Sequence, residues 1–249
     1  MLPFLLLSAA GLLAGAMNAI AGGGSFVTFP VMVFAGLPPV IANASSTVAL
    51  FPGTIASTFA YRHDLHGIGG FRLTVLAPLS FAAGVVGAML LLATPAHLFD
   101  AVIPFLLLLA ALTFAFGARA GIALRQVIRI GPRALPFVQF VIATYGGYFG
   151  GAVGLMMMAS WCLLTESDDL KAMTPARVLL TSAANGGAVL CFIIAGAVRW
   201  PETLAMLAAS VIGGYLGARL TRLLPPAIVR RFVIALTALV TLVFFLRMI

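Results

Sequence analysis

Charged residues are scarce in this chain. Only 8% of its 249 residues are Asp, Glu, Lys or Arg, whereas 63% are apolar, and the mean hydropathy is +1.18. A soluble domain has about a quarter of its residues charged, because its surface faces water. The shortage excludes a soluble globular enzyme, a disordered chain and a coiled coil. It leaves a polytopic membrane protein whose surface is solvated mainly by lipid.

Groups that carry catalysis are also few. The two cysteines, Cys162 and Cys191, lie in apolar stretches, so no disulfide framework is expected. The sequence has no nucleophile–base set, no zinc motif and no glycine–lysine–serine phosphate loop, and therefore predicts neither an enzyme nor a bound cofactor or metal. No carboxylate falls clearly in the middle of an apolar segment, so a carboxylate proton relay is not supported.

Long apolar segments are what the sequence has instead. They are too long for barrel strands and do not alternate, which indicates helices. Two of them, residues 2–37 and 134–165, exceed one straight span, and glycines lie in the middle of each. We expect the first stretch to break at Gly22-Gly23-Gly24-Ser25 and to be an uncleaved membrane segment rather than a signal peptide. The second contains Gly146, Gly147, Gly150, Gly151 and Gly154.

Similar landmarks occur in both halves of the chain. A shift of 136 residues places Gly11 and Gly15 on Gly147 and Gly151, and Ser45-Ser46 on Thr181-Ser182. The pattern predicts an all-α fold of two repeats, each a glycine-broken helical hairpin followed by three transmembrane helices. The predicted domains are residues 1–117 (first repeat), 118–133 (a basic cytoplasmic linker) and 134–249 (second repeat).

The positions of Lys and Arg discriminate between two topologies. If each broken stretch crosses the membrane once, the fourteen Lys and Arg residues divide into 8 and 6. If each stretch is a hairpin that returns to its own side, only Arg199 and Arg247 lie opposite the other twelve. Positive residues collect in the cytoplasm, which favours hairpins. The two repeats are then inverted, and both termini lie outside the cytoplasm; re-entrant and fully spanning hairpins fit the count equally well.

The first hairpin supplies one half of a candidate anion site. A helix that begins at the triple glycine would direct free N–H groups and its positive dipole end into the membrane. Asn18 precedes this tip, and Ser45-Ser46 opens the next segment. Close helix packing is the alternative role for the glycines, and the broken helix is favoured for the triple glycine.

The second half supplies Thr181-Ser182 and Asn185. Arg177, Thr181 and Asn185 recur at i, i+4 and i+8, so they share one helix face. We interpret Arg177 as a marker of the cytoplasmic boundary rather than a ligand. For the second glycine group, anion binding and close packing are about equally favoured, and the stripes Ser80-Gly84-Ala88 and Ser210-Gly214-Ala218 indicate close packing. The candidate substrate-binding residues are Asn18, Gly22, Gly23, Gly24, Ser25, Ser45, Ser46, Thr181, Ser182 and Asn185.

At these residues the sequence resembles the sulfite exporter TauE/SafE family of membrane transporters. The resemblance is carried by Gly11-x3-Gly15, Ala19-Ile20-Ala21-Gly22-Gly23-Gly24, Phe29-Pro30, Gly36-Leu37-Pro38-Pro39, Ala42-Asn43-Ala44-Ser45-Ser46-Thr47 and the second-copy run from Tyr145 to Gly154. The second copy departs from the family pattern at Leu155-Met156-Met157-Met158. The resemblance implies export of sulfite or a related sulfur oxyanion, with a substrate that varies within the family.

Together these observations predict a secondary transporter of small anions in a bacterial inner membrane. The alternatives are an anion-permeable channel and, less favoured, a membrane enzyme or assembly factor. The expected partners are the small anion and the lipid bilayer. Nucleic acid is not an expected partner despite the net charge of +8, because the arginines lie in short loops where they set topology and meet anionic headgroups. The packing stripes permit a homodimer.

Overall fold

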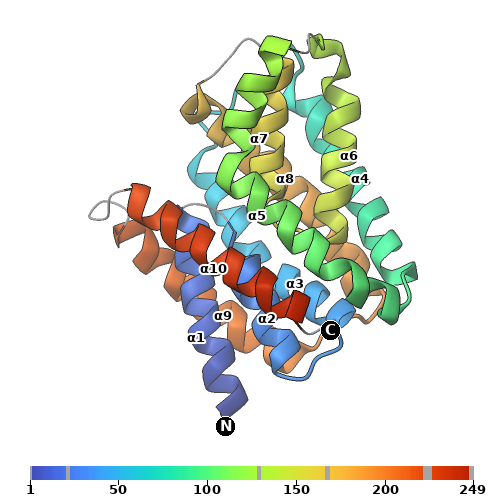
Figure 1. Ribbon diagram of the computed structural model, residues 1–249, viewed down its shortest axis with the longest axis vertical. Helices are drawn as coiled ribbons and strands as arrows, with labels where there is room; N and C mark the ends of the chain where they lie inside the picture. Colours follow the sequence, from blue (N-terminus) through green and yellow to red (C-terminus); the bar gives the residue numbers. More distant parts are fainter. Residues whose placement is uncertain (1, 21–22, 128–129, 166–168, 221–225, 247–249) are drawn as a thin grey trace. The chain divides into compact units, whose positions relative to one another are not determined.

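The computed structural model describes residues 2–20, 23–127, 130–165, 169–220 and 226–246 (Figure 1). Gly22 and Arg247, which entered the sequence argument, lie outside these residues. Within the described ranges the chain forms helices and no strand, and its one β-bridge joins Ile68 and Phe71. The all-α fold is thereby confirmed.

The helices follow one another in the order α1 (Leu2–Ile20), α2 (Ser25–Phe34), α3 (Pro39–Ala60), α4 (Leu73–Ala93), α5 (Ala96–Val127), the 3-10 turn η1 (Pro132–Ala134), α6 (Leu135–Tyr148), α7 (Val153–Leu164), α8 (Leu170–Ile194), α9 (Trp200–Leu220) and α10 (Pro226–Leu246). Helix α5 runs ten residues beyond the expected end at Gly117, so much of the expected linker is helical.

Among the described residues, four helical segments are long and apolar enough to cross a membrane: Pro39–Ala60, Leu73–Ala93, Ala96–Gly117 and Leu170–Ile194. Of the four arms of the broken stretches, α1 has 19 residues, about 28 Å, and the other three are shorter. Helices α2, α6 and α7 have 10, 14 and 12 residues, or about 15, 21 and 18 Å against a hydrocarbon core of about 30 Å. These lengths favour re-entrant arms over full crossings.

Both long apolar stretches break where the glycines lie. Helix α1 ends at Ile20 and α2 begins at Ser25; α6 ends at Tyr148 and α7 begins at Val153. Three helices follow each pair; the inverted relation of the two halves stays a prediction. The helix ends place the two hairpins 128 residues apart rather than 136, and Gly11 and Gly15 therefore do not correspond to Gly147 and Gly151. Apolar helices align in several registers, and the corner of the hairpin is the better landmark.

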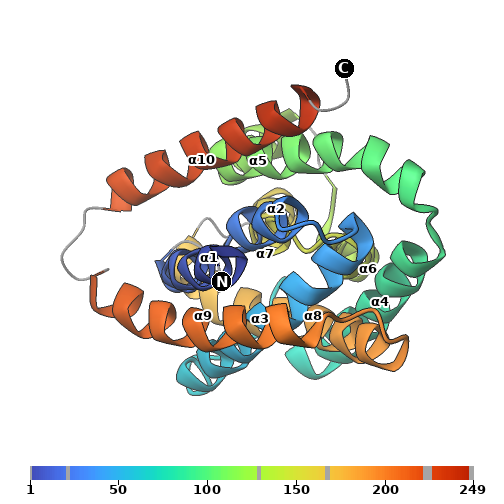
Figure 2. The ribbon, with the colours of Figure 1, turned by 90° about the horizontal axis from the view of Figure 1, so that it is seen from below.

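The chain divides into two compact units, each assembled from both halves of the sequence. Unit 1 contains residues 1–53, 91–111 and 192–249. Here the α1–α2 hairpin lies between α9 and α10 (Figure 2). Helices α1 and α9 touch at their backbones, because a Cβ added at Gly15 would overlap the carbonyl oxygen of Ser210, and one at Gly213 would overlap that of Leu12. On the other side, Phe29 stacks on Phe244 with ring centroids 5.8 Å apart.

Unit 2 contains residues 54–90 and 112–191. Glycine again sets its closest contacts: a Cβ at Gly87 would overlap the carbonyl oxygen of Thr144 on α6, and one at Gly84 would overlap that of Ala184 on α8. Gly147 meets Gly84 in the same way. The second glycine group therefore contributes both a helix break and a packing face.

Gly15→Ala is expected to destabilise the protein, whereas Gly53→Ala is not. The alanine methyl at residue 15 has no space against the Ser210 carbonyl, and overpacking of this kind costs about 1–3 kcal/mol. Gly53 lies within α3 with nothing within 4 Å of an added Cβ, so alanine there should be neutral or stabilise by about 0.5–1 kcal/mol. Thermal unfolding of both variants in one detergent tests the contrast; equal melting temperatures would contradict the tight contact.

Candidate functional site

The first polar group lies at the corner of the α1–α2 hairpin, in unit 1. Gly23 has a φ of +100°, a conformation that glycine adopts readily. The backbone N–H of Gly24 donates to Oδ1 of Asn18 at 2.8 Å. Gly24 is buried, and a Cβ there would lie 2.7 Å from the carbonyl oxygen of Ala14. Asn18 thus satisfies a backbone donor that the broken helix would otherwise leave unpaired.

Thr28 connects this corner to α3. Its hydroxyl lies 3.3 Å from the carbonyl oxygen of Gly24 and 2.5 Å from Oγ of Ser46. Thr28 and Ser46 are both buried. Sequence reasoning identified Ser46 and missed Thr28, whose only signal was its place one turn into α2. Asn18, Gly24, Thr28 and Ser46 form one buried, uncharged group, called the corner cluster below.

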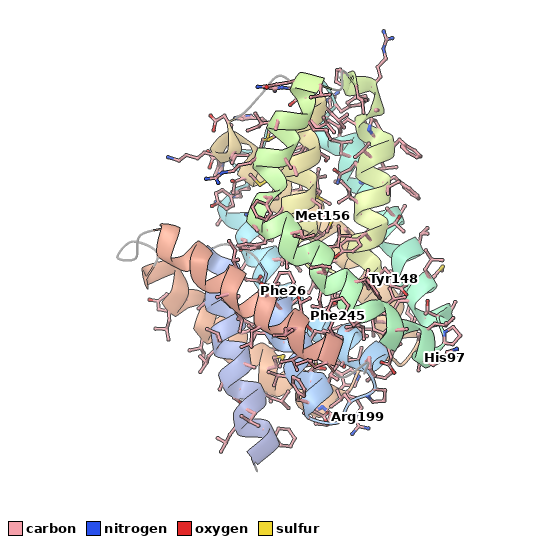
Figure 3. All side chains as sticks on the ribbon, in the orientation of Figure 1. Phe26, His97, Tyr148, Met156, Arg199 and Phe245 are labelled. Atoms are coloured by element: carbon pink, nitrogen blue, oxygen red, sulfur yellow. The ribbon has the colours of Figure 1, made fainter. Side chains whose placement is uncertain are left out.

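Ser45 faces a different partner from its neighbour Ser46. Its hydroxyl accepts the backbone N–H of Arg199 at 3.0 Å. Arg199 immediately precedes α9, and Figure 3 labels its side chain there. That side chain lies 3.4 Å from Glu202 in an ion pair whose arginine is exposed, an arrangement that contributes little stability. Ser45 therefore ties α3 to the start of α9. Ser25 is the half-buried first residue of α2.

The second polar group lies in unit 2, where α7 begins beside α8 (Figure 1). Ala152 precedes α7 in the left-handed conformation, with φ +57° and ψ +13°, and no side chain caps the helix among the described residues. Gly154 lies in the first turn. A Cβ there would be 3.1 Å from both Cγ of Arg177 and Oγ1 of Thr181. The glycine therefore allows the α8 side chains to approach the α7 backbone.

The polar face of α8 continues from this contact. The Thr181 hydroxyl lies 3.8 Å from Sδ of Met157 on α7, and Ser182 accepts a hydrogen bond from Thr58 at 3.0 Å. Two atoms on this face, Nε of Arg177 and Oδ1 of Asn185, are buried without a hydrogen-bond partner among the described residues. The sequence predicted that Thr181 and Arg177 share a face, with Arg177 more a boundary marker than a ligand. The structure adds the contact of both with Gly154.

A third buried polar group has its hydrogen bonds within the protein. Gln139 donates to Ser80 at 2.9 Å and accepts from the indole of Trp161 at 3.3 Å. This network joins α4, α6 and α7 and has the satisfied geometry of a structural core. In the ranges that the structure describes, no group of three or more His, Cys, Asp or Glu side chains could hold a metal.

The candidate residues therefore fall into two sets, one in each unit. Unit 1 holds Asn18, Gly23, Gly24, Ser25, Ser45 and Ser46, and unit 2 holds Thr181, Ser182 and Asn185. Their role in binding substrate stays a prediction. Each of these residues is either a glycine at the α1–α2 break or a short polar side chain in a largely apolar segment.

Comparison with known proteins identifies the family. The family model described as Sulfite exporter TauE/SafE matches residues 7–244. The chain belongs to this family. The family and its curated relatives are membrane transporters and not enzymes, which agrees with the expectation from the sequence.

Curated relatives align along most of the chain. A "Probable membrane transporter protein ORF9" from Sinorhizobium sp is 30% identical, covering 88% of this chain and 82% of that protein. The "Probable membrane transporter protein YfcA" of Escherichia coli (strain K12) is 28% identical, covering 92% and 85%. A "Probable membrane transporter protein" of Haemophilus influenzae is 25% identical, covering 93% and 90%. No solved structure matches the chain.

Breaking the contact between Thr28 and Ser46 is expected to cost stability unless both partners are removed. Thr28→Val keeps the shape of the side chain but leaves a buried hydroxyl on Ser46, at a cost of about 1–3 kcal/mol. The double variant with Ser46→Ala should regain part of this loss, and a double-mutant cycle from thermal unfolding measures the coupling. Thr47→Val is the matched control, because that hydroxyl bonds the carbonyl of Asn43 in its own helix. Strict additivity would show that the contact contributes nothing.

Proposed function

We propose that this chain is a secondary transporter that exports small oxyanions, such as sulfite or organic sulfonates, by alternating access. The observation that carries the proposal is the corner cluster: a break inside an apolar stretch, surrounded by buried hydroxyl and amide groups and by no described carboxylate. Membership of a membrane transporter family supports the same function.

The chemistry of the corner cluster suits an anion better than a cation. Asparagine, threonine and serine can each donate a hydrogen bond, and the amino-terminal end of α2 contributes a positive dipole end. Transporters commonly bind anionic groups at such broken helices. The described carboxylates, Asp64, Asp100, Asp169 and Glu202, lie in loops or at helix starts.

The helix lengths support a mechanism in which the hairpins enter the membrane without crossing it. A short re-entrant arm ends inside the bilayer and can present its backbone to a water-filled cavity. We further propose that the protein lies in the bacterial inner membrane, with both termini outside the cytoplasm, because the arginine distribution then follows the positive-inside rule.

Transport in proteoliposomes tests the function. Purified protein should catalyse saturable uptake and counterflow of at least one of sulfite, thiosulfate and sulfoacetate. Ser46→Ala should lower the rate about 10-fold, because one hydrogen bond to an ionised ligand contributes about 1.5 kcal/mol or more, whereas Thr47→Val should leave it unchanged. No flux for any of the three anions would contradict the proposal, and large single-channel currents without counterflow would replace it with a channel.

Orientation is tested by reporters fused to each terminus. Alkaline phosphatase fused after Ile249 should be active, since it is active only outside the cytoplasm, and a fluorescent protein at the same position should stay dark after Sec export. A matched fusion after Ala120, which lies among the basic residues between the repeats, should give the opposite result. A fluorescent carboxyl-terminal fusion would overturn the hairpin topology.

A further inference from the structure

Arg177 combines a formal charge with an apolar position. It is the eighth residue of α8, within a segment of 25 residues that is long and apolar enough to span the membrane. Its stem packs on the first turn of α7, where Cγ and Cδ lie 3.1 and 3.2 Å from the position of a Cβ on Gly154. Its Nε is buried and has no hydrogen-bond partner among the described residues.

No described carboxylate neutralises this guanidinium. In the ranges that the structure describes, the recorded ion pair joins Arg199 and Glu202. Arg177 is half-buried as a whole, and burying part of a charge without a partner is costly. Ionisable groups at membrane depth are typical of substrate pathways.

The groups around Arg177 are hydrogen-bond donors. Oγ1 of Thr181 lies 3.1 Å from the same Cβ position on Gly154, so the hydroxyl and the guanidinium stem border one small space. The first turn of α7 borders it too. The amides of Leu155 and Met156 bond the carbonyl oxygen of Ala152. Those of Val153 and Gly154 come before the first intrahelical bond, and among the described residues no side chain caps the helix. Guanidinium, hydroxyl and helix amides together select a small oxyanion.

Asn185 extends this donor set along α8. It lies two turns beyond Arg177 on the same face, and its Oδ1 is also buried without a partner in the described structure. Rotation of the amide by 180° would place an NH2 donor at that position. The face therefore carries a charged donor, a hydroxyl and an amide in succession, leading deeper into the segment.

We propose that Arg177 is the charged ligand of an oxyanion site at the start of α7, completed by Thr181 and by the backbone around Gly154. The proposal rests on the transport function above and names the charged residue that recognises its substrate. The ligand is a small group with at least two anionic or partly anionic oxygens, as in sulfite or a sulfonate. An arginine that only marked the membrane boundary would need neither the glycine contact nor the neighbouring donors.

Sodium sulfite added to the detergent-solubilised full-length protein tests the site. A bound ligand raises the melting temperature, so sulfite should stabilise the wild type. Arg177→Gln should abolish this shift. Without sulfite it should melt at the same temperature as the wild type or higher, because it removes a half-buried charge whose Nε has no partner among the described residues. Arg177→Lys should retain part of the shift. Arg133→Gln, at an exposed arginine in η1, is the matched control and should behave as the wild type.

Gly154→Val gives an independent test that keeps the charge. The valine side chain would occupy the space between α7, Arg177 and Thr181 and should remove the sulfite-dependent shift even if Arg177→Gln fails to fold. In proteoliposomes, Arg177→Gln should raise the KM for sulfite about 10- to 100-fold, the usual range for a charge-assisted hydrogen bond.

Three outcomes would overturn the site. The first is that Arg177→Gln keeps both the sulfite-dependent rise in melting temperature and the KM of the wild type. The second is that a folded Arg177→Gln melts at a lower temperature than the wild type without sulfite, which indicates a structural role. The third is stabilisation of the wild type by short-chain phosphatidylglycerol but not by sulfite, which assigns the guanidinium to a lipid phosphate. If Arg177→Gln transports sulfite as well as the wild type does, the Arg177 site is wrong but the transport function stands. If the wild type transports no anion, the proposed transport function is wrong.

Discussion

Satisfying backbone groups where a helix stops inside an apolar environment is the constraint on which this structure depends. Helix α1 ends at Ile20 and α2 begins five residues later, so the amides at the corner need acceptors that neither lipid nor the helix provides. Asn18 provides one for Gly24, and Thr28 links the new helix to Ser46. The polar side chains that satisfy the backbone at this break are also the ones that could hydrogen-bond a polar substrate. The same groups therefore serve stability and the candidate function.

Close packing through glycine holds each unit together. Helix α1 contacts α9 backbone to backbone through Gly15 and Gly213, and α4 contacts α6 through Gly87 and Gly147. In both pairs the partners come from opposite halves of the chain. Each hairpin is thereby fixed against a helix of the other half, and the small residues leave the backbones close enough for van der Waals attraction without a hydrophobic driving force.

The sequence alone was sufficient for the features that depend on local composition. The apolar runs predicted the helices, and the glycine groups predicted both breaks, because glycine lacks the side chain that would keep a helix favourable there. The polar contacts were harder to predict: Thr28, Gln139 and Trp161 acquire their partners through tertiary packing that no spacing encodes. At the hairpins, the spacing of the helix ends is eight residues shorter than the shift that aligned the glycines, since apolar helices look alike in many registers. Arg177 was interpreted as a boundary residue because its contact with Gly154 is also tertiary.

The packing of α1 on α9 has a consequence for biosynthesis. Gly11 and its contact at Met206 are about 200 residues apart, and at about 5–20 residues per second the ribosome needs roughly 10–40 s to make the intervening chain. During that interval the glycine face of the first hairpin is inserted but has no permanent neighbour. The translocon, a chaperone or the lipid itself must shield it, so α1 enters the bilayer well before the helix that makes its final contacts.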